Sequence, residues 1–164
     1  MFDLINGLPV HPLVVHAVVV LLPLASIGAI AIALRPSWRR QYGVLVVACA
    51  AFATVLIPVA TSSGEALERR VGDPGAHASM GDQLIWFAIP LLVLVSALVW
   101  FDRRANSSLG TDPVQTQSAG GKVGLVHVIA ALTVIAALAT TVQVYRVGDS
   151  GARAAWGDQV SSTN

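Results

Sequence analysis

The chain alternates between long apolar stretches and short polar connections. Four stretches contain no Asp, Glu, Lys or Arg, and they cover residues 12–34, 42–61, 83–101 and 123–145. Each is close to the ~20 residues that an α-helix needs to cross a hydrocarbon core of ~30 Å. Valine and isoleucine are common in these stretches, but open strands would leave backbone groups unpaired in lipid, so helices are favoured. The pattern predicts four membrane-spanning helices.

Composition supports a membrane protein. Of the 164 residues, 55% are hydrophobic and only 12% are charged, and the mean hydropathy is +0.71. A soluble domain carries about 25% charged residues. Pro23, Pro58 and Pro90 fall inside the apolar stretches, where membrane helices tolerate proline and each one predicts a local kink. We expect an all-α fold, an integral membrane four-helix bundle forming a single transmembrane domain over residues 1–164.

Charged residues in the connections predict the orientation. The connections after the first and third stretches hold six of the ten basic residues, which are Arg35, Arg39, Arg40, Arg103, Arg104 and Lys122. Only Asp102 and Asp112 oppose them there. Cytoplasmic connections of membrane proteins carry an excess of Lys and Arg. We therefore expect a multi-pass protein of the bacterial plasma (inner) membrane with both termini extracytoplasmic, and a flexible cytoplasmic loop at 106–121.

The sequence contains an internal repeat. Residues 71–84 read VGDPGAHASMGDQL, residues 147–160 read VGDSGARAAWGDQV, and nine of the fourteen positions are identical. Each copy follows an apolar stretch and is expected outside the membrane. The repeat predicts two tandem two-helix hairpins of the same orientation. Its aspartates are typical of turns and helix caps, and the alternative is an acidic rim that binds a cation or a partner.

The four histidines are the candidate ligands for a metal or a redox cofactor. His16 and His127 lie inside apolar stretches, at opposite ends and some 15 Å apart along the membrane normal at ~1.5 Å per residue, so one ion cannot bind both. His11 and His16 are five residues apart and do not share a helical face. Pro12 disfavours helix at His11, so His11 is expected just before the first helix.

One outer-side ligand set follows from these positions. His11, His16 and His77, with Glu65 and Asp82 on the same side, predict a site for Zn²⁺, Cu²⁺ or haem iron. Their spacing matches no fixed metal motif. The alternative is that the histidines only bond to neighbouring helices and help them to pack.

The N-terminal segment GLPVHPLVVHAVVVLLPLA, residues 7–25, resembles the opening of a bacterial membrane family catalogued as domain of unknown function two-two-three-one. Gly64 and Glu65 after the second stretch, and Gly148, Gly151 and Ala152 after the fourth, match further motifs of that family. The resemblance covers nearly the whole chain. It implies four spans, and the joining of some relatives to Rieske-type domains implies a haem or redox role. This chain departs from many relatives at Ala78 and Asp149, where they have Glu and His.

Three functions remain open. The first is a non-catalytic subunit that binds b-type haem or a metal ion through His11, His16 and His77 and serves electron transfer. The second is an accessory subunit of a larger membrane complex without a cofactor, in contact with other membrane or extracytoplasmic proteins or with copies of itself. The third is a small dimeric transporter. An enzyme is least supported because no nucleophile lies beside a base, and a net charge of +1 gives no footprint for nucleic acid.

Overall fold

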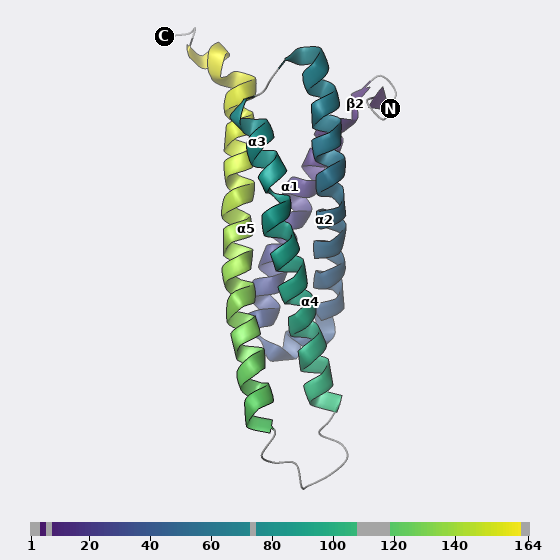
Figure 1. Cartoon of the computed structure of the whole chain (residues 1–164), viewed down its shortest axis with the longest axis vertical. Helices are drawn as coiled ribbons and strands as arrows, with labels where there is room; N and C mark the ends of the chain where they lie inside the picture. The colour runs from purple at the N-terminus through teal and green to yellow at the C-terminus, as the bar shows by residue number, and fades with distance from the viewer. Residues whose placement is uncertain (1–3, 6–7, 73–74, 108–118, 162–164) are drawn as a thin grey trace.

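The computed structural model describes residues 4–5, 8–72, 75–107 and 119–161. Its elements, in chain order, are β1 (Leu4–Ile5), β2 (Leu8–Pro9), α1 (Val10–Leu34), α2 (Pro36–Val71), α3 (Ala76–Gln83), α4 (Ile85–Ser107) and α5 (Ala119–Ser161). The two strands form a small antiparallel ladder in which Ile5 lies opposite Leu8. The four long helices run side by side along one axis, and the short α3 leads into α4 (Figure 1).

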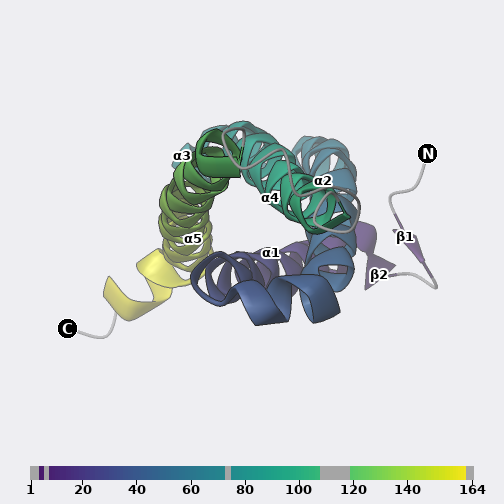
Figure 2. The ribbon, with the colours of Figure 1, turned by 90° about the horizontal axis from the view of Figure 1, so that it is seen from below.

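The four long helices form a ring in which α1 packs against α2 and α5, and α4 packs against the same two helices (Figure 2). Among the described residues, four helical segments are long and apolar enough to cross a membrane: Val10–Leu34, Pro36–Arg69, Ala76–Arg104 and Gly124–Trp156. The predicted all-α fold with four such helices is confirmed. The internal duplication of hairpins stays a prediction.

Two helices extend well beyond the apolar stretches that predicted them. The 36-residue α2 was expected only over 42–61, and the 43-residue α5 only over 123–145. At ~1.5 Å per residue, α2 is ~54 Å long, against ~30 Å of hydrocarbon. Hydropathy indicates only the part of a helix that contacts lipid. The backbone hydrogen bonds of α2 and α5 continue into polar sequence beyond that part. The expected loop at 106–121 shrinks accordingly, and residues 108–118 lie outside the described residues.

The surface of the bundle is apolar and its interior is rich in small residues. Exposed large side chains occur on every long helix, for example Val20, Leu45, Val93 and Ile135, each more than half exposed. The buried positions include many alanines and hydroxyl residues: Ala25, Ser26, Ala29, Ala50, Ala53, Ala88, Thr133, Ala137 and Thr140. Small residues let membrane helices approach closely. Large aliphatic side chains fill part of the core, as Leu22, Leu91 and Leu98 do, and many others lie on the outer surface. An outer surface with this many exposed apolar side chains fits a bilayer rather than water.

The two ends of the bundle differ in chemistry. We call the end with the α1–α2 turn and the end of α4 the arginine end, because Arg35, Arg40, Arg103 and Arg104 lie there with exposed side chains. The opposite end holds β1, β2, α3 and the last turns of α5, and we call it the histidine end (Figure 1). The first and last described segments of the chain thus lie at the same end.

Arg39 departs from its expected place in a cytoplasmic loop. Only Arg35 separates α1 from α2, so Arg39 lies inside α2 and not in a connection. Its side chain is buried and only 3% exposed. Its Nη1 donates to Asp102 Oδ1 of α4 at 2.9 Å, and its Nε and Nη2 donate to the carbonyls of Ile32 and Ala33 at 3.1 and 3.2 Å. The last carbonyls of a helix have no partner within it. Arg39 therefore caps α1 while it joins α2 to α4.

The two copies of the sequence repeat have different conformations. The first copy ends α2, passes through Gly72 and Gly75, both with positive φ, and then forms α3, whereas the second lies entirely within α5. Positive φ is easily adopted by glycine. Asp73 of the first copy lies outside the described residues, as does the side chain of Asp158 in the second. The repeated sequence thus leads to a break in one place and a continuous helix in the other.

The break between α3 and α4 is held from α5. The Leu84 amide donates to the Gly81 carbonyl at 3.0 Å, one residue closer than in an α-helix. The Met80 carbonyl instead accepts from the Gln143 Nε2 of α5 at 3.2 Å. A buried backbone carbonyl requires a partner, and the Gln143 side chain supplies it. Gln143 thereby ties α3 to α5 just before the break.

Candidate functional site

A cavity opens at the histidine end between α1, α2, α3 and α5. Its volume is about 360 Å³, which is within the range of small-molecule sites. Most of its lining is apolar, with Val15, Val18, Ile57, Leu67 and Leu84 among the contributors. Thr61 adds a hydroxyl group, and the ionisable side chains that line the cavity are His11, Glu65, Glu68, His77 and Asp82. The cavity therefore combines an apolar wall with two imidazoles and three carboxyl groups.

His11 is fixed against α2. Its Nδ1 donates to the Ala60 carbonyl at 2.9 Å and lies 3.4 Å from the Ser63 hydroxyl, which itself donates to the same carbonyl. The ring lies over Gly64, where an added Cβ would be 3.0 Å from its Cε1. His11 belongs to the first turn of α1, which begins at Val10, so the expectation that it precedes the helix is wrong. Pro12 is tolerated there because amides of a first turn have no helical partner.

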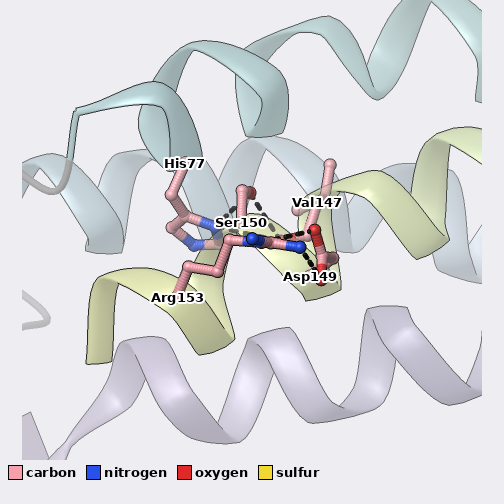
Figure 3. A network of polar contacts seen from close by, with 5 residues as sticks. All are labelled: His77, Val147, Asp149, Ser150 and Arg153. Carbon is pink, nitrogen blue, oxygen red and sulfur yellow. Dashed lines mark hydrogen bonds and ion pairs between the residues drawn. The ribbon is translucent and has the colours of Figure 1, made fainter. Parts of the chain in front are cut away.

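His77 is fixed against α5 (Figure 3). Its Nδ1 donates to the Val147 carbonyl at 3.1 Å and lies 3.4 Å from the Ser150 hydroxyl. That hydroxyl donates to the same carbonyl at 2.8 Å. The ring lies over Gly151, where an added Cβ would be 2.9 Å from its Cε1.

The two histidines therefore occupy the same kind of seat. In each, one imidazole bonds to the carbonyl of residue n on the neighbouring helix, with Ser at n+3 and Gly at n+4. The seats are Ala60, Ser63 and Gly64 for His11, and Val147, Ser150 and Gly151 for His77. We name them the first and second histidine seats. The sequence contains a signal for them, the two Ser-Gly pairs at 63–64 and 150–151, but neither pair by itself indicates which histidine it meets.

Four of the five predicted ligand residues line this cavity, and one does not. His11, His77, Glu65 and Asp82 are brought together at its wall. His16 is exposed on the surface of α1, and its Nδ1 donates to the Pro12 carbonyl of its own helix. This agrees with the prediction that His11 and His16 lie on different faces. His127 lies on the half of α5 nearer the arginine end and is exposed.

The carboxyl groups sit at the mouth of the cavity rather than around a common point. Glu65 and Asp82 are exposed, and Glu68 is half-buried. Among the described residues, no three His, Cys, Asp or Glu side chains are grouped closely enough to hold a metal ion. Beside the second seat, Asp149 accepts from Arg153 at 2.9 Å in an exposed pair one turn apart (Figure 3). The acidic mouth favours cations near the cavity without enclosing one.

The fixed imidazoles define the chemistry of the site. A carbonyl oxygen only accepts, so Nδ1 carries the proton in both rings and the neutral ring keeps a lone pair on Nε2. Within the described part of the chain, neither Nε2 has a hydrogen-bond partner. This is the arrangement of ligating histidines, whose second nitrogen donates to a carbonyl or carboxylate. Each Nε2 can bind iron, bind another metal or accept a proton.

The comparisons with known proteins agree with this architecture. The model of a family described as "Predicted membrane protein (DUF2231)" matches residues 7–164, from the start of the His11 motif through α5. Searches of curated proteins and of solved structures found no match. The matched region includes both histidine seats and all four long helices, so the chain belongs to the predicted membrane protein family DUF2231.

Proposed function

We propose that the protein is a non-catalytic membrane subunit that binds a b-type haem in the histidine-end cavity and serves electron transfer. The observation that carries the proposal is the pair of equivalent seats, which present His11 and His77 to one cavity with Nδ1 already bonded. Imidazole is the usual axial ligand of b-type haem iron. The apolar wall suits the faces of a porphyrin ring, which are themselves apolar.

The donor set favours haem over a bare metal ion. A structural zinc site needs four protein ligands and a catalytic one needs three. Since no group of three metal-binding side chains occurs among the described residues, a bare ion would require the side chains to move. Haem brings four of its own nitrogen ligands and asks the protein for one or two. His11 and His77 are therefore the proposed ligands, and His16 is removed from the set because it lies outside the cavity.

Absorption spectroscopy tests this proposal. The protein is purified in detergent from cells grown with a haem precursor, and spectra are recorded in the oxidised and the dithionite-reduced state. We expect a Soret band and reduced α and β bands in the wild type, and their loss in His11→Ala and His77→Ala. His16→Ala is the matched control and should leave the spectrum unchanged.

A second candidate function rests on the same hydrogen bonds. Each histidine joins two helices, His11 linking α1 to α2 and His77 linking α3 to α5. Such contacts stabilise a membrane bundle with no ligand at all. If the spectrum is featureless and elemental analysis finds no stoichiometric metal, the protein is better described as an accessory subunit of a membrane complex. Proteins that co-purify with it from native membranes, or a dimer in detergent, would then identify its assembly.

A further inference from the structure

Two arginines at the arginine end are stacked on tryptophan rings. The Cζ atom of Arg35 lies 4.8 Å from the ring centroid of Trp38 at the start of α2. The Cζ atom of Arg104 lies 4.5 Å from the ring centroid of Trp100 near the end of α4. Stacking occupies the face of a guanidinium and leaves its N–H edge available. Each pair is a positioned hydrogen-bond donor with its orientation already set.

Both pairs lie at the same level of the bundle. The buried ion pair between Arg39 and Asp102 joins α2 to α4 at 2.9 Å. Arg35 is one turn from Arg39 along α2, and Arg104 is two residues beyond Asp102 in α4. The ion pair therefore aligns the start of one helix with the end of the other.

Among the described residues of this end, the charge is positive and no exposed acid neutralises it. Within residues 32–45, 96–107 and 119–130, Asp102 is the only acidic residue, and its side chain is buried against Arg39. Arg40, five residues after Arg35, adds a further exposed positive charge. An anionic group that approaches here meets several arginines and no competing carboxylate among the described residues.

The aromatic residues place these arginines at the headgroup level of a bilayer. Trp38, Tyr42 and Trp100 are 41%, 42% and 56% exposed on the helix surface. Trp and Tyr concentrate where the hydrocarbon meets the headgroups. The stacked guanidiniums therefore lie where lipid phosphates are found rather than in bulk water.

We propose that the Arg35–Trp38 and Arg104–Trp100 pairs bind the phosphates of anionic phospholipids in the leaflet that faces the arginine end. A planar guanidinium edge matches a phosphate with two hydrogen bonds. A zwitterionic lipid offers the same phosphate, but its cationic headgroup amine is repelled by the neighbouring arginines. The surface therefore selects for net negative lipids. The inference is independent of the histidine-end cavity.

Tryptophan quenching by brominated lipids measures this selectivity. The Trp86→Phe and Trp156→Phe changes leave only Trp38 and Trp100 as reporters. This protein is placed in vesicles that contain phosphatidylglycerol or phosphatidylcholine brominated near the headgroup. One surface arginine changes the affinity for an anionic lipid roughly fivefold. We expect the relative binding constant to favour phosphatidylglycerol at least about fivefold, and to fall close to one in Arg35→Gln/Arg104→Gln.

Three comparisons make the test specific. Arg69→Gln/Arg146→Gln removes the same charge from the histidine end and should leave the preference unchanged. Arg35→Lys/Arg104→Lys keeps the charge but not the guanidinium edge, so part of the preference should be lost. Inorganic phosphate added at constant ionic strength should not compete.

The proposal is overturned by any of four results. These are equal binding of both lipids by the wild type, an equal loss in the histidine-end control, full preference in the lysine variant, and competition by inorganic phosphate. The last would indicate a site for soluble phosphate. The changed arginines are exposed, so the fold is checked by helicity in the same samples.

Discussion

The imidazole of His77 lies directly on Gly151, so closely that a Cβ at that position would be 2.9 Å from the ring. Gly64 has the same relation to His11. Both glycines lie in the region that the family model matches. Each makes room for an imidazole that bonds to the carbonyl four residues earlier on the same helix.

Replacing Gly151 by alanine should displace His77. In a helix interior, Gly→Ala ordinarily stabilises by about 0.5–1 kcal/mol, but here the methyl group would collide with the ring. We therefore expect that Gly151→Ala does not raise the free energy of unfolding. We also expect it to change the His77 imidazole resonances in NMR spectra. Gly148→Ala is the matched control, because nothing lies within 4 Å of a Cβ there and the helix is the same. Equal behaviour of the two variants would contradict the seat.

The Asp102→Ala change should strongly destabilise the arginine end. Arg39 would remain buried without its charge partner, which costs about 3–5 kcal/mol. The comparison is Asp149→Ala, which breaks an exposed pair with Arg153 that solvent screens, so only a small loss of stability is expected. The measurement is the free energy of unfolding in mixed micelles with increasing SDS. A similar small loss in both variants would mean that Arg39 finds other partners.

Removing the Gln143 amide should loosen α3. In Gln143→Leu the Met80 carbonyl loses its partner, with an expected cost of about 1–3 kcal/mol. Because Met80 lies in α3, we expect faster amide hydrogen exchange over residues 76–83, with little change in the centre of α5. Thr141→Val serves as the control, since Thr141 is exposed and bonds only within its own helix. Unchanged exchange in α3 would show that other contacts hold it.

The predicted orientation can be tested with single cysteines. The native Cys49 is first replaced by serine, and cysteine is then introduced at the exposed positions Ser79 in α3 and Ser37 in α2. If the arginine end faces the cytoplasm, a membrane-impermeant maleimide labels the Ser79→Cys variant in intact cells. The Ser37→Cys variant should react only after the membrane is permeabilised. The reverse pattern would place the arginine end outside.

The sequence by itself determined the number and type of the long elements. Charge-free stretches of about twenty residues match the length of a membrane-crossing helix, which pairs all of its backbone groups within one segment. The positions of His11, Glu65, His77 and Asp82 on one side of the membrane followed from counting spans, and all four do line one cavity. Helical periodicity alone predicted that His16 and His11 lie on different faces of the helix.

Only the tertiary structure decided where the helices end, what each histidine bonds to and which charges are buried. Hydropathy reports contact with lipid, so it did not indicate that α2 and α5 continue as helices into polar sequence. A histidine seat needs an imidazole from one helix and a Ser-Gly pair from another. The local sequence does not indicate which helices pack together. Arg39 looked like its neighbours Arg35 and Arg40 in sequence. It is buried because helix packing brings Asp102 and the end of α1 together around it.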